Sequence, residues 1–228
     1  MTAAYDAHRT LFVLNPDRFA EVRGAETLVI CGAARGMTSM VSYALHALNY
    51  PLGERLGPLN YEDREFLDCL PETLRLQSRW RPLRGLRRLV RARNAAYPRW
   101  GFKLPHAIFY APVLRRRLRN PVFVVCVRNP LGTVSSISRR EAKKAMSFDR
   151  MYRHATAYQR ALSWLLRQAD LPVVLINMDA AKANPGRFLN DLTELLALKG
   201  NLHRIKAELE QNGYSAADTG DRRGQAAG

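Results

Sequence analysis

The chain has 228 residues, with 36 Lys and Arg against 20 Asp and Glu and a net charge of +16. This length is enough for one domain with a buried core, and no stretch reaches the roughly 18 apolar residues of a membrane span. The first residues lack the charged-then-apolar pattern of a secretory signal, so we expect a single cytoplasmic domain over 1–228. The three cysteines cannot all pair and their spacing is wrong for zinc, which predicts reduced core thiols and no metal site.

The basic residues are concentrated in one segment. From Thr73 to Arg140 the chain carries 17 Lys and Arg and no Asp or Glu, and the remainder is close to neutral. A one-sided block of this kind indicates a surface that faces an anion: a nucleotide, an acidic polysaccharide, a lipid headgroup layer or nucleic acid. For the part before Pro98, a solvated basic face without a dedicated partner is the alternative.

Strands and helices are expected to alternate along the chain. Residues 1–24 are expected to be a loosely structured lead-in. The first strand is predicted at 27–31, and a helix is predicted at about 38–49. Residues 54–98 are predicted to be a basic helical insertion. The remaining expected elements are, in chain order, helices near 61–69 and 72–95 within that insertion, a short strand at 99–103, a helix at 106–118, a strand at 122–127, a helix from about Leu131, a long helix at 148–169, a strand at 173–176, helices at 185–198 and 200–211, and a flexible tail at 212–228.

This alternation predicts an α/β fold, in which a parallel sheet carries helices on both faces and a phosphate-binding loop follows the first strand. Right-handed crossovers place the turns that follow parallel strands at one edge of the sheet. The turns after 27–31, near Lys103 and at Arg128 are therefore expected to converge.

The turn after the first strand resembles a phosphate loop, but not the Walker A type. Met37 stands five residues after Gly32 and no lysine follows, so the lysine that cradles a nucleoside triphosphate is missing. Strand 122–127 ends in Arg128 rather than in an Asp that could help to hold magnesium. These differences count against a phosphate-loop kinase.

The same turn still offers groups that bind phosphate. Arg35 supplies a forked charge, and the hydroxyls of Thr38 and Ser39 add donors at a helix start, where free N–H groups favour anions. An ordinary helix start with Thr38 or Ser39 as N-cap is the alternative.

The second basic turn begins at Arg128, and Ser136 follows eight residues later. Because it also follows a buried strand, it is expected at the same binding edge. Two such turns in one chain point to a ligand with phosphate at both ends. The alternative is that Ser136 is merely one of three serines on a half-exposed helix.

The helix predicted at 72–95 is amphipathic. Leu83, Leu86 and Val90 share one face. The arginines of the other face are Arg84, Arg87, Arg88 and Arg91. A basic amphipathic helix of this kind predicts peripheral contact with an anionic membrane or polysaccharide.

Together, the two turns resemble those of the sulfotransferases that use 3′-phosphoadenosine 5′-phosphosulfate (PAPS), in their bacterial branch. The family's R-S-G-T-[ST] loop stands here as RGMTS at 35–39, and its R-[ND]-P element with a serine eight residues on is matched by Arg128 and Ser136. Further segments resemble the family as well: LGERL at 52–56, YEDREF at 61–66, WGFKLPH at 100–106 and the ending 172–198. The chain departs from the family at Gly36-Met37, where Ser-Gly is usual, and at Leu104 and His106, which replace Asp and Arg.

The resemblance implies a sulfotransferase-like fold and transfer of a sulfuryl group from PAPS to a hydroxyl acceptor, with adenosine 3′,5′-bisphosphate as product and no metal. The acceptor is expected to be a carbohydrate, a lipid or a small metabolite, and an acidic acceptor would suit the basic surface. The implied cofactor-binding residues are Arg35, Gly36, Met37, Thr38, Ser39, Arg128 and Ser136. Lys103 would contact the sulfuryl or bridging oxygens, and Glu62 and His106 are alternative general bases.

Two other functions stay open at this point. One is a divergent phosphate-loop kinase that requires magnesium and ATP. The other is a basic module that binds nucleic acid or an anionic membrane on a degenerate phosphate-loop fold. Few aromatic residues are interleaved in the basic block, which counts against nucleic acid.

Overall fold

A computed structural model describes residues 8–33, 35–58, 60–71, 82–134 and 147–211. The strands within them are β1 (Leu11–Leu14), β2 (Thr27–Gly32), β3 (Trp100–Lys103), β4 (Pro121–Val127) and β5 (Val173–Asn177). The helices are α1 (Pro16–Val22), α2 (Thr38–Ala47), α3 (Arg64–Cys69), α4 (Pro82–Ala96), η2 (Pro105–Tyr110, a 3₁₀ helix), α5 (Ala111–Arg117), α7 (Phe148–Leu166), α8 (Met178–Ala183), α9 (Pro185–Leu196) and α10 (Leu202–Glu210), with a further helical stretch at 130–134.

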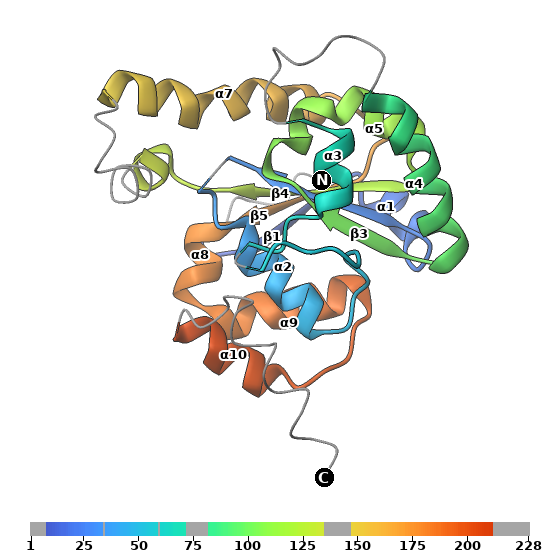
Figure 1. Ribbon diagram of the computed structural model, residues 1–228. Helices are drawn as coiled ribbons and strands as arrows, with labels where there is room; N and C mark the ends of the chain where they lie inside the picture. The colour runs from blue at the N-terminus through green and yellow to red at the C-terminus, as the bar shows by residue number, and fades with distance from the viewer. Residues whose placement is uncertain (1–7, 34, 59, 72–81, 135–146, 212–228) are drawn as a thin grey trace.

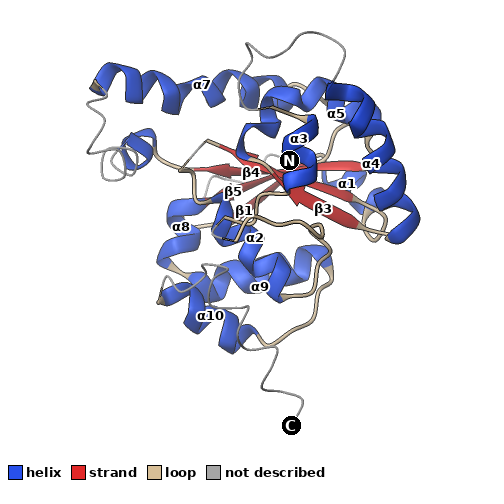
Figure 2. Ribbon diagram, viewed as in Figure 1, coloured by secondary structure: helices blue, strands red, loops and turns tan. Residues whose placement is uncertain are grey.

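The strands of the described residues form one five-stranded sheet in the order β1-β5-β4-β2-β3. β2 pairs in parallel with β3 and with β4, and β4 pairs in parallel with β5 (Figure 2). Only β1, of these strands, runs antiparallel to its neighbour β5. The predicted α/β class with a mainly parallel sheet is therefore confirmed.

Two apolar cores lie on opposite faces of the sheet because side chains alternate along each strand. In β2, Leu28 and Ile30 belong to one core, and Val29 and Cys31 belong to the other. Helices α2, α8, α9 and α10 cover the first face, and α3, α4, α5 and α7 cover the second (Figure 1). This gives three layers, with helices on both faces as predicted.

The expectation of a loosely structured lead-in is wrong for residues 11–22, which form β1 and α1. β1 extends the sheet beyond β5, and Phe19 of α1 is buried in the core. Asn15, between them, donates its side-chain amide to the carbonyl oxygens of Gln168 and Leu171, at 2.8 and 2.7 Å. These long-range contacts build the segment into the domain.

The remaining elements follow the sequence pattern with small differences. The helix expected at 106–118 divides into η2 and α5, and the short helix α8 was not predicted. The apolar stripe of α7 is core, since Met151, Tyr158 and Leu165 are buried. Parts of four predicted segments fall outside the described residues: 1–7 of the lead-in, 72–81 of the basic insertion, 135–146 of the helix predicted from about Leu131, and the tail 212–228.

The cysteines are free and buried, as predicted: Cys31, Cys69 and Cys126. Cys31 lies on β2 and Cys126 on the neighbouring strand β4. In the part of the chain that the structure describes, no helix has the length and apolar character needed to cross a membrane.

Candidate functional site

The carboxyl ends of the parallel strands bring the predicted turns together at one edge of the sheet. Gly32 pairs with Cys126 at the ends of β2 and β4, and Ile30 pairs with Lys103 of β3. Arg128 follows directly after β4. The convergence expected from the sequence is thus present for the turns after β2, β3 and β4.

The loop after β2 is tightly built. Gly32 has φ +148°, and a Cβ atom there would lie 2.6 Å from the carbonyl oxygen of Cys126, so only glycine fits. Arg35 and Met37 have φ of +64° and +62°, in the left-handed region that non-glycine residues rarely adopt. Gly36 is required for a different reason, because its Cβ would lie 2.7 Å from the carbonyl oxygen of Ala33. The positive φ angles therefore fall on the two residues flanking Gly36.

The N-terminus of α2 faces this loop. Its N-cap is Met37, whose thioether side chain caps none of the helix N–H groups, and Thr38 is the first helical residue. The alternative that Thr38 or Ser39 is an ordinary N-cap is therefore wrong. The Ser39 hydroxyl donates instead to the carbonyl oxygen of Asn60 at 3.2 Å. A helix start without a side-chain cap is suited to an anion, because its first N–H groups and the helix dipole both favour negative charge.

Arg128 joins the two turns. Its Nη1 donates to the carbonyl oxygen of Arg35 at 3.2 Å, and its Nε lies 3.7 Å from Oδ1 of Asp179. That Nε is buried and makes no hydrogen bond within the described residues. Gly132 leaves room for the guanidinium, since a Cβ atom there would lie 3.2 Å from Nε. Ser136 lies outside the described residues, so its place relative to Arg128 stays a prediction.

Lys103 and Glu62 form an ion pair at the same edge. Lys103 Nζ donates to Glu62 Oε1 at 2.9 Å, and the side chains are 2% and 26% exposed. Burial lowers the pKa of Lys103, the charge of Glu62 opposes this, and the charge of Arg35 adds to the lowering. The N–H of Asp63 donates to the carbonyl oxygen of Lys103 at 3.2 Å, which ties the Glu62 segment to the end of β3.

His106 does not join this group. It is buried in η2, and its Nε2 hydrogen-bonds the carbonyl oxygen of Leu70 at 2.7 Å. Because a carbonyl can only accept, Nε2 carries the proton and the ring is fixed against the end of α3. Of the two candidate bases, Glu62 is the one that contacts Lys103.

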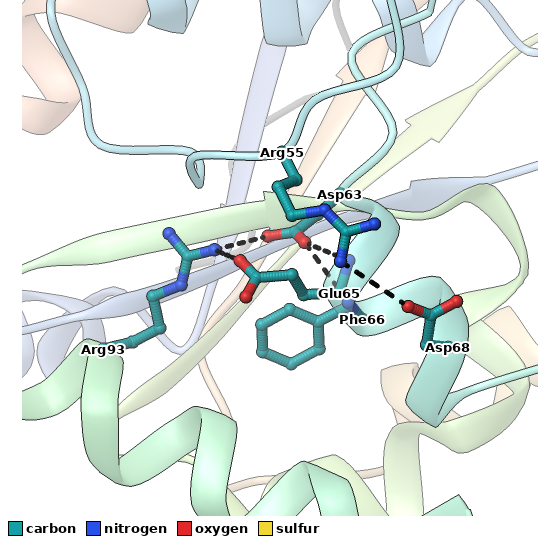
Figure 3. A network of polar contacts seen from close by, with 6 residues as sticks. All are labelled: Arg55, Asp63, Glu65, Phe66, Asp68 and Arg93. Carbon is teal, nitrogen blue, oxygen red and sulfur yellow. Dashed lines mark hydrogen bonds and ion pairs between the residues drawn. The ribbon is translucent and has the colours of Figure 1, made fainter.

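A buried charge cluster behind Glu62 was not expected from the sequence. Asp63 caps α3 by accepting from the N–H groups of Glu65 and Phe66, and Arg93 of α4 pairs with both Asp63 and Glu65 (Figure 3). Burial raises the pKa of Asp63 to about 6, and Arg93 opposes the rise. This cluster fixes the backbone next to Glu62.

A small cavity lies between the ends of β2 and β4 and helix α7. Gly32, Cys126 and Arg128 line it from the strand ends, and Tyr158 lines it from α7. The described residues include no group of three or more His, Cys, Asp or Glu side chains that could hold a metal ion.

The fold and the edge define an α/β protein with a phosphate-loop-like turn and a second basic turn beside it. No protein-family profile matches the sequence, and no curated protein matches it. Among solved structures, the chain is similar to a sulfotransferase from Alicyclobacillus acidocaldarius. That match has a TM-score of 0.42 and 17% sequence identity, and it covers 75% of this chain and 81% of that one.

Proposed function

We propose that this protein is a sulfotransferase that uses PAPS and acts on a hydroxyl acceptor. The observation that carries the proposal is the hydrogen bond between Arg128 and the backbone of Arg35, which joins two basic turns at the edge where Lys103 and Glu62 also lie. Two adjoining anion-binding turns suit a ligand with phosphate at both ends. The missing Walker lysine sets this site apart from that of a nucleoside triphosphatase.

The residues present fit such a cofactor. Arg35 and the uncapped start of α2 would hold the 5′-phosphosulfate, with Gly36, Met37, Thr38 and Ser39 shaping that loop. Arg128, with Ser136, would hold the 3′-phosphate, and its buried Nε has a hydrogen bond to give. When bound, PAPS supplies the sulfuryl group, whose bond to the 5′-phosphate oxygen breaks as the bond to the acceptor oxygen forms.

Lys103 and Glu62 would carry the proton and charge changes. Glu62 takes the proton of the acceptor hydroxyl, because its carboxylate is partly exposed and already oriented by Lys103. Lys103 is buried and donates to Glu62, and its ammonium form would stabilise the negative charge that develops on the bridging oxygen as the bond from that oxygen to sulfur breaks.

Kinetics of two variants separate the candidate bases. Glu62→Gln is expected to lower kcat at least 100-fold, because the amide cannot accept the proton. His106→Asn is expected to lower stability while leaving kcat within a few-fold, since His106 bonds a backbone carbonyl. A large loss of kcat in His106→Asn with normal turnover in Glu62→Gln would reverse the assignment.

The proposal is tested first by calorimetric titration with adenosine 3′,5′-bisphosphate, 5′-AMP and ATP in buffer without magnesium. Micromolar binding that requires the 3′-phosphate and is lost in Arg128→Ala is expected. The exposed Arg116→Ala serves as the control and is expected to bind normally. Equal binding of all three nucleotides, or binding of none, would overturn the proposal.

We also propose that the exposed face of α4 contacts an anionic surface. Arg87, Arg88 and Arg91 are exposed, whereas Leu86 and Val90 pack into the core. The side chain of Arg84, the fourth arginine of the predicted face, is outside the described set. Replacing Arg87, Arg88 and Arg91 together by Gln is expected to weaken binding to anionic vesicles or an acidic polysaccharide while sparing nucleotide binding. Unchanged binding to both surfaces would contradict this contact.

A further inference from the structure

A groove of about 600 Å³ runs between η2 and α7, next to the candidate site. Its apolar part is made by Ile108, Phe109 and Trp164, and its basic part by Arg153 and Arg160. A groove of this volume is in the range that holds a small organic ligand. None of these residues belongs to the charge cluster around Asp63 or to the two basic turns.

The groove adjoins the edge where transfer would take place. Ile108 lines both the groove and the small cavity bounded by Gly32, Cys126 and Arg128. η2 begins at Pro105, two residues after Lys103, so the wall of the groove continues directly from the strand that carries the lysine. A ligand in the groove would therefore reach the candidate site.

The charge of the groove has one sign. None of the described residues that line it is Asp or Glu. Arg153 pairs with Asp149 one turn earlier on α7, whereas Arg160 pairs with no carboxylate of the described residues. An apolar wall with an unneutralised guanidinium favours a ligand that has an apolar body and an anionic group.

The apolar character continues along α7 beyond the groove. Phe148 and Tyr152 lie about two turns and one turn before Thr156, a lining residue, and they are 60% and 42% exposed. Their rings stack with centroids 6.0 Å apart. Two exposed, stacked aromatic rings beside the groove suit a ligand with an extended apolar body better than a bare sugar.

We infer that this groove binds the acceptor, and that the acceptor is a hydroxyl-bearing amphiphile whose anionic group pairs with Arg160. That this ligand is the acceptor rests on the proposed function. Its chemical class, an anionic amphiphile, rests on the groove itself. Bare carbohydrates and neutral alcohols are the poorer substrates under this assignment.

Binding of two matched probes to the full chain, without cofactor, tests the ligand class. 6-Hydroxy-2-naphthoate carries the carboxylate that 2-naphthol lacks, and quenching of tryptophan fluorescence reports both. The naphthoate is expected to bind about tenfold more tightly than the naphthol, with the difference shrinking as salt is raised. Arg160→Gln is expected to remove the difference while keeping naphthol binding.

Two further variants give the control and the location. Arg204→Gln changes an exposed arginine of α10, on the opposite face of the sheet, and is expected to bind both probes normally. Ala157→Phe adds bulk at an exposed lining position and is expected to weaken both probes without unfolding the protein. Circular dichroism melts confirm that each variant is folded.

The outcomes separate this inference from the proposed function. Equal affinity for the two probes, or an undiminished preference in Arg160→Gln, overturns the inference even if adenosine 3′,5′-bisphosphate binds as proposed. Naphthoate binding through Arg160 in a protein that fails to bind the bisphosphate supports the ligand class and overturns the proposed function. Transfer to the naphthoate hydroxyl that requires both Arg160 and Arg128 supports both.

Discussion

The carboxylate of Asp63 is fully buried and depends on one arginine for its counter-charge. Arg93 Nη2 lies 3.4 Å from Asp63 Oδ2, and the two side chains are 6% and 0% exposed. Burial raises the pKa of Asp63 to about 6, above the value of about 4 in an unfolded chain. Compared with the unfolded chain, the folded state therefore binds this proton more tightly. The stability that comes from this tighter proton binding is fully present below pH 4 and is lost as the pH rises through 6.

Replacing Arg93 by Met is expected to lower the free energy of unfolding by about 3–5 kcal/mol at pH 7.5, because it leaves a buried carboxylate unpaired. The loss is expected to shrink at pH 5, where protonation removes the charge of Asp63. Urea unfolding at the two pH values measures both effects.

The matched control for this change is Arg91→Met, two residues earlier on α4 and exposed. Its free energy of unfolding is expected to stay within about 0.5 kcal/mol of the unchanged protein. A loss in Arg93→Met that is the same at pH 5 and pH 7.5 would show that packing, not the charge of Asp63, accounts for it.

Gly132 controls the position of Arg128. A Cβ atom at residue 132 would lie 3.2 Å from Nε, so Gly132→Ala must shift the guanidinium by a few tenths of an ångström. We expect affinity for adenosine 3′,5′-bisphosphate to fall by about three- to tenfold, with unchanged or increased stability because alanine favours the helix. Gly186→Ala near the start of α9, where the new Cβ makes ordinary contacts, is the control. Unchanged affinity in Gly132→Ala would mean that Arg128 does not bind the nucleotide.

At the scale of single residues, the sequence predicted which side chains lie near the carboxyl ends of β2, β3 and β4. It did not predict which residues Arg93 and His106 contact. Arg93 falls within the helix predicted at 72–95 but is not among the four arginines of its basic face, and it lies seven positions after Leu86, on the same helix face as that buried side chain. This spacing was the signal of an inward arginine. The contact of His106 with Leu70 had no such signal, because it depends on how η2 packs against the end of α3.

At the scale of the element, α9 is followed by a residue whose backbone conformation is unfavourable for its side chain. Ala197 has φ +48° and ψ +52°, the left-handed conformation that glycine adopts at helix ends. Ala197→Gly is expected to raise the free energy of unfolding by about 1 kcal/mol, because glycine lacks the Cβ that is strained there. Chemical denaturation measures the change.

The opposite sign is expected where the same substitution falls inside a helix. Ala92 is exposed in the middle of α4, and Ala92→Gly is expected to cost about 1 kcal/mol. If both substitutions destabilise equally, the left-handed end of α9 contributes no strain.

The three elements that the sequence analysis did not predict, β1, α1 and α8, are short. β1 is a four-residue apolar run, LFVL, and it is a strand because β5 offers it an edge, which a local pattern does not reveal. The Pro at the first position of α1, directly after Asn15, was a usable signal of a helix start. α8 has little apolar periodicity, and its N-cap is the Asn177 side chain, which accepts from Ala180 N.

At the scale of the whole molecule, the thiols of Cys31 and Cys126 report the integrity of the sheet. Both lie on neighbouring central strands, burial raises the pKa of Cys126 to about 12, and it also raises that of Cys31. Because the thiolate is the reactive form, iodoacetamide at pH 8 is expected to leave both unmodified in the folded protein. In denaturant all three cysteines should react, as counted by mass spectrometry. Rapid modification of Cys126 without denaturant would show that the sheet opens at the carboxyl end of β4.

The layered architecture was predictable because it follows from alternation of strands and helices, a property of the whole chain. The convergence of the turns followed from the same rule. The groove between η2 and α7 was not predictable, because its residues come from segments about 40 positions apart and meet only through tertiary packing.

Helix α4 separates two kinds of charge. Its inward Arg93 pairs with Asp63, the residue next to Glu62. Arg87, Arg88 and Arg91 are exposed on the other side and take no part in this ion pair. Arg87, Arg88 and Arg91 can therefore be substituted, in evolution or in a combinatorial library, without changing the position of Glu62 beside Lys103. If α4 contacts an anionic surface and Glu62 acts as the base, as proposed above, the residues for targeting and those for chemistry lie on opposite sides of one helix. Targeting could then change in evolution at constant turnover.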